Sequence, residues 1–223
     1  GASNTGVGFT SLLVNTASDN TAVGHNTLKA NTTGTRNVAV GANALDTNTT
    51  GSYNVAMGNG SLSANTTGTK NIAVGDFALD VNTTGGSNVA IGQDALGANT
   101  TASNNTAVGQ SALNANTTGA NNTALGGGSL DANTTGGFNV AVGYNALTTA
   151  TTANSNTAIG ESAMLSTTTG ADSVAVGKNA LYANTTGANN VAVGVLSLDA
   201  NTSGGSNVAL GTQALGTNIT GSY

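Results

Sequence analysis

Residues 37–53 read Asn-Val-Ala-Val-Gly-Ala-Asn-Ala-Leu-Asp-Thr-Asn-Thr-Thr-Gly-Ser-Tyr, and this seventeen-residue pattern returns along the whole chain of 223 residues. Twelve such units follow one another without a gap, and one unit that is a residue shorter precedes them. The units start at residues 4, 20, 37, 54, 71, 88, 105, 122, 139, 156, 173, 190 and 207. Self-similarity at a fixed period marks proteins in which each repeat is a structural unit that stacks on its neighbours. We therefore predict a single repeat domain over residues 1–223.

The columns of the repeat, numbered one to seventeen from its first residue, differ sharply in what they accept. Position three is Ala in every unit but the first, position five is always Gly, and position nine is Leu apart from Met164. All charged residues, the single His and every Phe and Tyr lie at positions six, seven, ten, sixteen or seventeen. Because charged side chains are almost never buried without a partner, these five columns are predicted to face solvent.

The local pattern predicts an all-β fold. The Asn-Val-Ala-Val segment favours a short strand that stops at Gly, and a seventeen-residue period is too short for a pair of helices. We expect two short strands and two turns per coil, Gly at position five with a positive φ or a close backbone contact, and a tight turn at Asn-Thr-Thr-Gly. The fold class is therefore a parallel β-solenoid of about thirteen coils of seventeen residues. The residues expected to hold the coils together include Gly41, Gly58, Gly75, Gly92, Gly109, Leu45, Leu79 and Leu113.

Two further expectations follow from stacking identical coils. Asn residues at positions one and twelve come to lie above one another, and such stacks can form ladders of side-chain amides. Positions two and four of the strand point one way and position three points the other, and both sides are apolar. A strand that is apolar on both faces is usually buried on both faces, so we expect one face to pack against another molecule.

The motif Asn-Val-Ala-Val-Gly-x-x-Ala, as at residues 37–44, resembles the N-S-V-A-I-G-x-x-S motif of YadA-like head domains in trimeric autotransporter adhesins. It is also similar to the N-T-A-V-G repeats of phage tail-fibre-type proteins. The resemblance recurs in every unit, including Ser173-Val174-Ala175-Val176-Gly177, so it covers nearly the whole chain. It implies a left-handed parallel β-roll, three chains per rod, and an adhesive or spacer role outside the cell. The usual coil of that family is shorter, and we place the additional residues in the Asn-Thr-Thr-Gly turn.

The composition argues against several classes of function. Charged residues make up only 6% of the chain and the net charge is −5, so the basic stripe of a nucleic-acid-binding protein is absent. There is no stretch of about eighteen apolar residues that could span a membrane. His25 is the only His, and no base recurs beside the many Ser and Thr residues, so nucleophilic catalysis lacks its activating partner. We expect no catalytic residues, no cofactor and no metal site.

Sugar attachment is a possible modification, because ten Asn residues stand in Asn-x-Ser/Thr acceptor motifs. These candidates are Asn31, Asn48, Asn65, Asn82, Asn99, Asn116, Asn133, Asn184, Asn201 and Asn218. The alternative, which we favour, is that these Asn residues stack inside the coil, where they could carry no sugar. The Thr residues of the same turns could be glycosylated through their hydroxyls if they point outward, or form a flat row that orders water and binds ice.

The leading functional hypothesis is a structural and adhesive rod or fibre, an adhesin head or filament subunit without enzymatic activity, located outside the cell, on a cell surface or in a virion fibre. An ice-binding or glycan-bearing solenoid surface is the alternative. The expected partners are other copies of the chain, in a homotrimer or an end-to-end filament, and a host surface or extracellular matrix. The repeat phase carries on at both ends, which favours a segment of a longer fibre.

Overall fold

The computed structural model describes residues 1–222, which are all-β and contain no helix. The chain divides into two compact units, the first covering Gly1–Ser111 and the second beginning at Ala112, and each is described by itself. The prediction of one domain over residues 1–223 stays a prediction.

Every coil of the described chain contains one three-residue strand, at positions two to four of the repeat. In unit 1 the strands are β1 (Thr5–Val7), β2 (Thr21–Val23), β3 (Val38–Val40), β4 (Val55–Met57), β5 (Ile72–Val74), β6 (Val89–Ile91) and β7 (Thr106–Val108). In unit 2 they are β8 (Thr123–Leu125), β9 (Val140–Val142), β10 (Thr157–Ile159), β11 (Val174–Val176), β12 (Val191–Val193) and β13 (Val208–Leu210).

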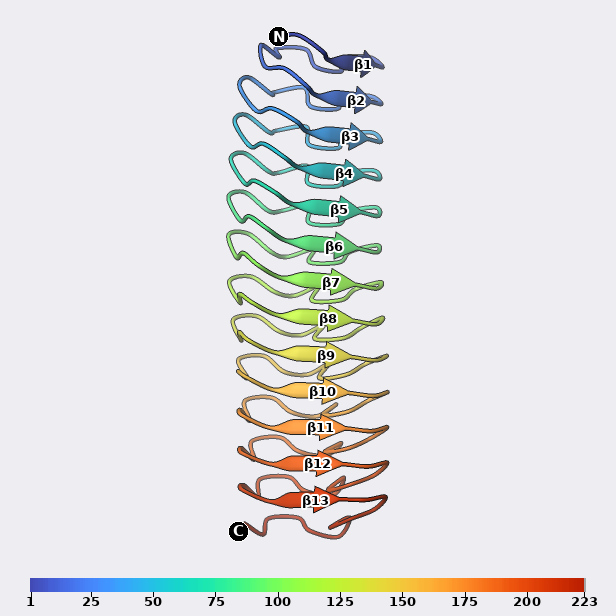
Figure 1. Cartoon of the computed structure of the whole chain (residues 1–223), viewed down its shortest axis with the longest axis vertical. Coiled ribbons are helices and arrows are strands. Elements are labelled where there is room, and N and C mark those ends of the chain that lie inside the picture. Colours follow the sequence, from blue (N-terminus) through green and yellow to red (C-terminus); the bar gives the residue numbers. More distant parts are fainter. Residues whose placement is uncertain (223) are drawn as a thin grey trace. The chain divides into compact units, whose positions relative to one another are not determined.

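Within each unit, strands that follow one another in sequence pair in parallel and in register. Ala39 lies opposite Ala56 and Ala56 opposite Ala73, one full repeat further along the chain. In Figure 1 the strands of each unit lie nearer the viewer and run from left to right, while the fainter return segments pass behind them and the chain descends. A chain that winds in this sense forms a left-handed coil. The predicted parallel β-solenoid with a seventeen-residue coil is therefore confirmed.

Glycine at position five follows each strand, and its backbone conformation there disfavours any other residue. Gly41 has a φ of 124°, in a region that L-residues rarely adopt, and a Cβ built on it would lie 2.5 Å from the carbonyl oxygen of Gly58. Both expectations for this column, a positive φ and a close contact between backbones, hold for Gly41. The same positive φ recurs at Gly58, Gly75, Gly92 and Gly109.

The expectation of two strands per coil is wrong, because the return segment is a succession of turns. Its residues at positions seven and nine adopt left-handed conformations, as in Asn43 at 59° and Leu45 at 52°. Their backbone groups still bond to neighbouring coils, for example Leu45 N–H to Ser61 O at 3.1 Å and Asn43 N–H to His25 O at 2.9 Å. Two left-handed residues separated by a single residue reverse the chain within a few positions, which an extended strand could not do.

The core inside the coils is narrow and partly polar. Except in the first and last coils, Ala at position three, Ala, Ser or Thr at position eight and Leu or Met at position nine are buried, and Leu45, Leu79 and Leu113 are among the largest fully buried side chains. Buried Asn residues at positions one and twelve complete this interior. No charged residue of the described chain is buried, so the five charged columns face outward as predicted.

Candidate functional site: the outward strand face

The side chains at positions two and four of the strands point away from the coil interior and form what we call the strand face. In β5 the outward Ile72 is 39% exposed, whereas the inward Ala73 is fully buried. The same alternation holds in unit 2, where Ile159 on β10 is 39% exposed and Ala158 is fully buried. Position two is Thr, Val or Ile and position four is Val, Ile, Leu or Met, so each unit carries an uncharged, mainly aliphatic face.

It is unusual for so many successive aliphatic side chains to remain partly exposed, as they do on the strand face. Met57 and Ile91 in unit 1 and Leu125 in unit 2 remain between 40% and 47% exposed, and the other members are half-buried or exposed. Single exposed apolar residues are common on protein surfaces, whereas a contiguous apolar face marks an interaction site. The strand face is therefore the candidate functional site of each unit.

Behind the strand face, the Asn side chains at position twelve form what we call the asparagine ladder. In unit 1, Asn48 Nδ2 donates to Asn31 Oδ1 at 2.8 Å, and Asn65 Nδ2 donates to Asn48 Oδ1 at 2.9 Å. Each amide also donates to the carbonyl oxygen three residues later, as Asn65 does to Gly68 at 3.1 Å. The Asn side chain thus closes the Asn-Thr-Thr-Gly bend and ties it to the next coil at the same time.

Asparagine at position one forms amide-to-amide bonds in some coils and bonds to the backbone as well. In unit 2, Asn139 Nδ2 donates to Asn122 Oδ1 at 3.2 Å and Asn207 Nδ2 donates to Asn190 Oδ1 at 3.0 Å. The Oδ1 of Asn37 accepts the backbone N–H of Asn54 in the next coil at 2.9 Å, and its Nδ2 donates to Gly51 O in the same coil at 2.9 Å. These bonds satisfy the backbone group directly before the strand, where no strand partner is available. Asn at this position therefore fixes the start of the next strand and, through it, the register of the strand face.

The candidate glycosylation residues lie in the interior. All of them except Asn218 are fully buried, and their amides take part in the hydrogen bonds of the asparagine ladder or in the bend beside it. Asn218 is half-buried, with its Nδ2 3.2 Å from Gly221 O. A buried amide nitrogen that already donates two hydrogen bonds has no room for a sugar in the folded coil.

In most bends two Thr residues stand side by side, and they separate into one hydrogen-bonded row and one exposed row. Thr49 at position thirteen is half-buried and its hydroxyl donates to Thr66 O at 3.0 Å, whereas Thr50 at position fourteen is exposed. The exposed row includes Thr67 and Thr84 in the following coils. Along these bends, one row of Thr hydroxyls therefore points outward, and the ice-binding alternative stays a prediction.

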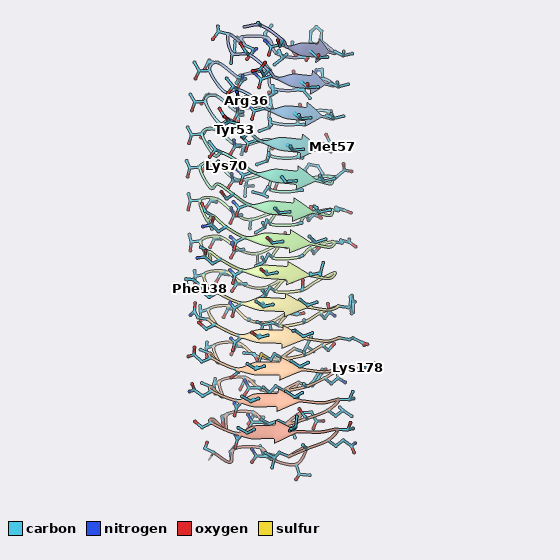
Figure 2. The ribbon with its side chains drawn as sticks, viewed as in Figure 1. Arg36, Tyr53, Met57, Lys70, Phe138 and Lys178 are labelled. Carbon is cyan, nitrogen blue, oxygen red and sulfur yellow. The ribbon has the colours of Figure 1, made fainter. Side chains whose placement is uncertain are left out.

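The charged and aromatic residues lie on the surface of each unit, away from the strand face. Figure 2 shows Arg36, Tyr53 and Lys70 in successive coils along one edge of unit 1, away from Met57 on the strand face. Arg36 donates to the Tyr53 hydroxyl, and its guanidinium lies 5.3 Å from the centre of that ring. In unit 2, Lys178 pairs with Glu161 at 3.0 Å with both side chains about half exposed, a geometry that contributes little to stability.

The groups most often used in catalysis are scattered. His25 is exposed and stacks on Phe9, with ring centres 5.8 Å apart. Partial burial raises the pKa of the Asp80 and Asp131 carboxyls at position ten above the usual range. Within residues 1–222 no three His, Cys, Asp or Glu side chains converge as metal ligands would. An open hollow at the last coil is lined by one carboxylate, that of Asp199, without a basic side chain beside it.

Comparison with known proteins adds no family assignment. No protein-family model matches the chain, and no curated protein matches it either.

Residues 1–222 also contain no helix of the length and hydrophobicity needed to cross a bilayer.

Proposed function

We propose that this chain is a structural and adhesive β-solenoid, part of an extracellular fibre or a surface adhesin, which acts by self-association and surface contact without catalysis. The observation that carries the proposal is the strand face, an uncharged and mainly aliphatic surface repeated in every coil of each unit. The resemblance of the repeat to YadA-like head domains and phage tail-fibre-type repeats supports the same role.

Self-association is the step that the strand face supports most directly. Complete burial of one Val, Ile, Leu or Met side chain contributes roughly 1.5–3 kcal/mol. The side chains of the strand face are already partly covered within the unit, so burial against a partner contributes about half of that energy. Because such side chains recur in each coil, even a modest gain per coil adds up along a unit. A second copy presents the same face at the same coil spacing, so repeat can pack against repeat. We propose a homotrimer as the associated form.

The remaining outward columns are suited to contacts that differ from coil to coil. Positions six, seven, ten, sixteen and seventeen vary freely and carry all the charges and aromatic rings. Their variation leaves the interior unchanged, because none of these charged side chains is buried in the described chain. We propose that these columns contact a host surface or extracellular matrix, in an extracellular, cell-surface or virion-fibre location.

The oligomeric state tests the proposal. We expect native mass spectrometry and sedimentation of the full chain to give a trimer, and Ile91→Glu on the strand face to shift it to folded monomer. Gln110→Glu adds the same charge at the exposed position six of a coil in unit 1 and should leave the trimer intact. A wild-type chain that stays monomeric at high concentration would contradict self-association. Failure of the trimer to bind any matrix protein or glycan on an array would contradict the adhesive role.

A further inference from the structure

One place in unit 2 departs from the polar interior described above. Ala150 stands at position twelve, where eleven of the thirteen units have Asn, and it is fully buried. Thr167 occupies the same position in the next coil and is 1% exposed. As a result, no donor in the described chain reaches the buried Oδ1 of Asn133 in the preceding coil.

An intact coil shows which bonds the substitution removes. Asn65 Nδ2 carries two hydrogens, and it donates one to Asn48 Oδ1 at 2.9 Å and the other to Gly68 O at 3.1 Å. In the coil of Ala150 the two corresponding acceptors are Asn133 Oδ1 and Ala153 O. Both acceptors are inside the coil, since Asn133 and Ala153 are fully buried.

We propose that a buried water molecule occupies the place of the missing carboxamide beside Ala150. A water molecule has two hydrogens, as Nδ2 has, and would donate one to Asn133 Oδ1 and the other to Ala153 O. The Thr167 hydroxyl, which accepts from Asn184 Nδ2 at 3.4 Å, has its own hydrogen to donate to the oxygen of that water. Buried waters in proteins typically make about three hydrogen bonds to polar groups of this kind.

Two physical arguments support water over an empty or collapsed space. A buried carbonyl oxygen without a donor is costly, and the site lined by Asn133, Ala153 and Thr167 is polar enough to hold water. The neighbouring coils also resist collapse, because the backbone bonds on either side fix the coil spacing. Thr151 N–H donates to Thr168 O at 3.1 Å, and Thr134 N–H donates to Thr151 O at 2.9 Å.

The number of long-lived buried waters tests this inference, and oxygen-17 magnetic relaxation dispersion of the full chain measures it. We expect Ala150→Asn to remove one such water and to raise the thermal midpoint by several degrees. Asn65→Ala creates the same gap in unit 1 and should add one water. Ala188→Asn places the same amide at half-buried position sixteen, where Asn154 occurs naturally, and should change neither quantity.

An unchanged water count in both Ala150→Asn and Asn65→Ala would overturn the proposal. Should Ala150→Asn fail to fold, a high-resolution crystal structure of the wild-type chain decides. Density within hydrogen-bonding distance of Asn133 Oδ1, Ala153 O and Thr167 Oγ1 is the expected result, and a dry site there refutes it. None of these outcomes depends on the proposed adhesive function.

Discussion

The regular coils of unit 1 and the coils from Asn139 to Asn189 in unit 2 show how far the interior of this solenoid can vary. In unit 1 the asparagine ladder runs without interruption from Asn31 to Asn99, with amide-to-amide distances of 2.8–3.0 Å. In the second region Ala150 and Thr167 replace ladder residues. Met164 replaces the core Leu and Ser173 the first Asn of the repeat there.

The strand geometry is nevertheless the same in both regions. β9, β10 and β11 pair in parallel and in register as β3, β4 and β5 do. Gly160 at position five has a φ of 133°, close to the 134° of Gly75. The comparison teaches that backbone constraints define the coil, whereas the polar side chains inside it add stability that single coils can forgo.

Substitution of the glycine at position five should destabilise the fold most, and by similar amounts in the two regions. We expect Gly75→Ala and Gly160→Ala each to destabilise the fold by about 3 kcal/mol or more, because each Cβ meets the next coil's backbone at 2.6 Å in a conformation that L-residues rarely adopt. Chemical denaturation measures both variants. A mild effect in unit 2 alone would show that the irregular coils can relax their backbone, contrary to the comparison.

Substitution of a ladder Asn should destabilise the fold less than loss of the glycine, and by different amounts in the two regions. Asn65→Ala removes hydrogen bonds to Asn48, Gly68 and Asn82, and we expect a loss of about 2–4 kcal/mol. Asn184→Ala should cost about two thirds as much, because one of its three hydrogen bonds, that to Thr167, is 3.4 Å long. Denaturant midpoints of the two variants provide the measurement. Equal losses of stability would mean that the replacement of ladder Asn residues by Ala150 and Thr167 leaves the next coil unaffected.

Hydrogen exchange should reveal the same contrast without mutation. Ala150 N–H lies 3.4 Å from Leu147 O, whereas the equivalent distance from Asn65 N–H to Leu62 O is 3.1 Å. Local openings occur where stabilising contacts are fewest, so we expect the Ala150 amide to exchange about tenfold faster, the equivalent of about one net hydrogen bond. Exchange followed by NMR under native conditions tests this. Slower exchange at Ala150 than at Asn65 would contradict a weak point in unit 2.

The smallest effect concerns the pH dependence of stability, which arises from the half-buried carboxyl group of Asp131. Partial burial raises the pKa of Asp131 in the folded chain, so the folded state takes up a proton more readily than the unfolded state does. Stability should therefore increase slightly as the pH falls through the folded pKa, and Asp131→Asn should reduce this increase, leaving the share of Asp80, whose pKa is raised in the same way. Asp172→Asn, at an exposed position without such burial, is the matched control. Thermal midpoints measured between pH 3 and 7 decide, and an increase as large in Asp131→Asn as in the wild-type chain contradicts the assignment.

The repeat by itself determined the fold class, the coil length, the inward Ala and outward aliphatic columns, and the surface placement of every charge. These features follow from period and residue type, because burial of charge is costly and strand side chains alternate. The need for Gly at position five was equally readable from the sequence, since a column that accepts no other residue points to a backbone requirement.

Only the tertiary structure decided how the rest of each coil turns and how its Asn residues are used. Leu45 in a left-handed conformation has no local signal, because Leu does not favour positive φ and adopts it here through burial and bonds to adjacent coils. Asn37 and Asn48 look alike in sequence, yet one caps the next strand and the other builds a ladder. That distinction depends on which groups of the neighbouring coil lie within reach, and only stacking brings residues seventeen positions apart into contact.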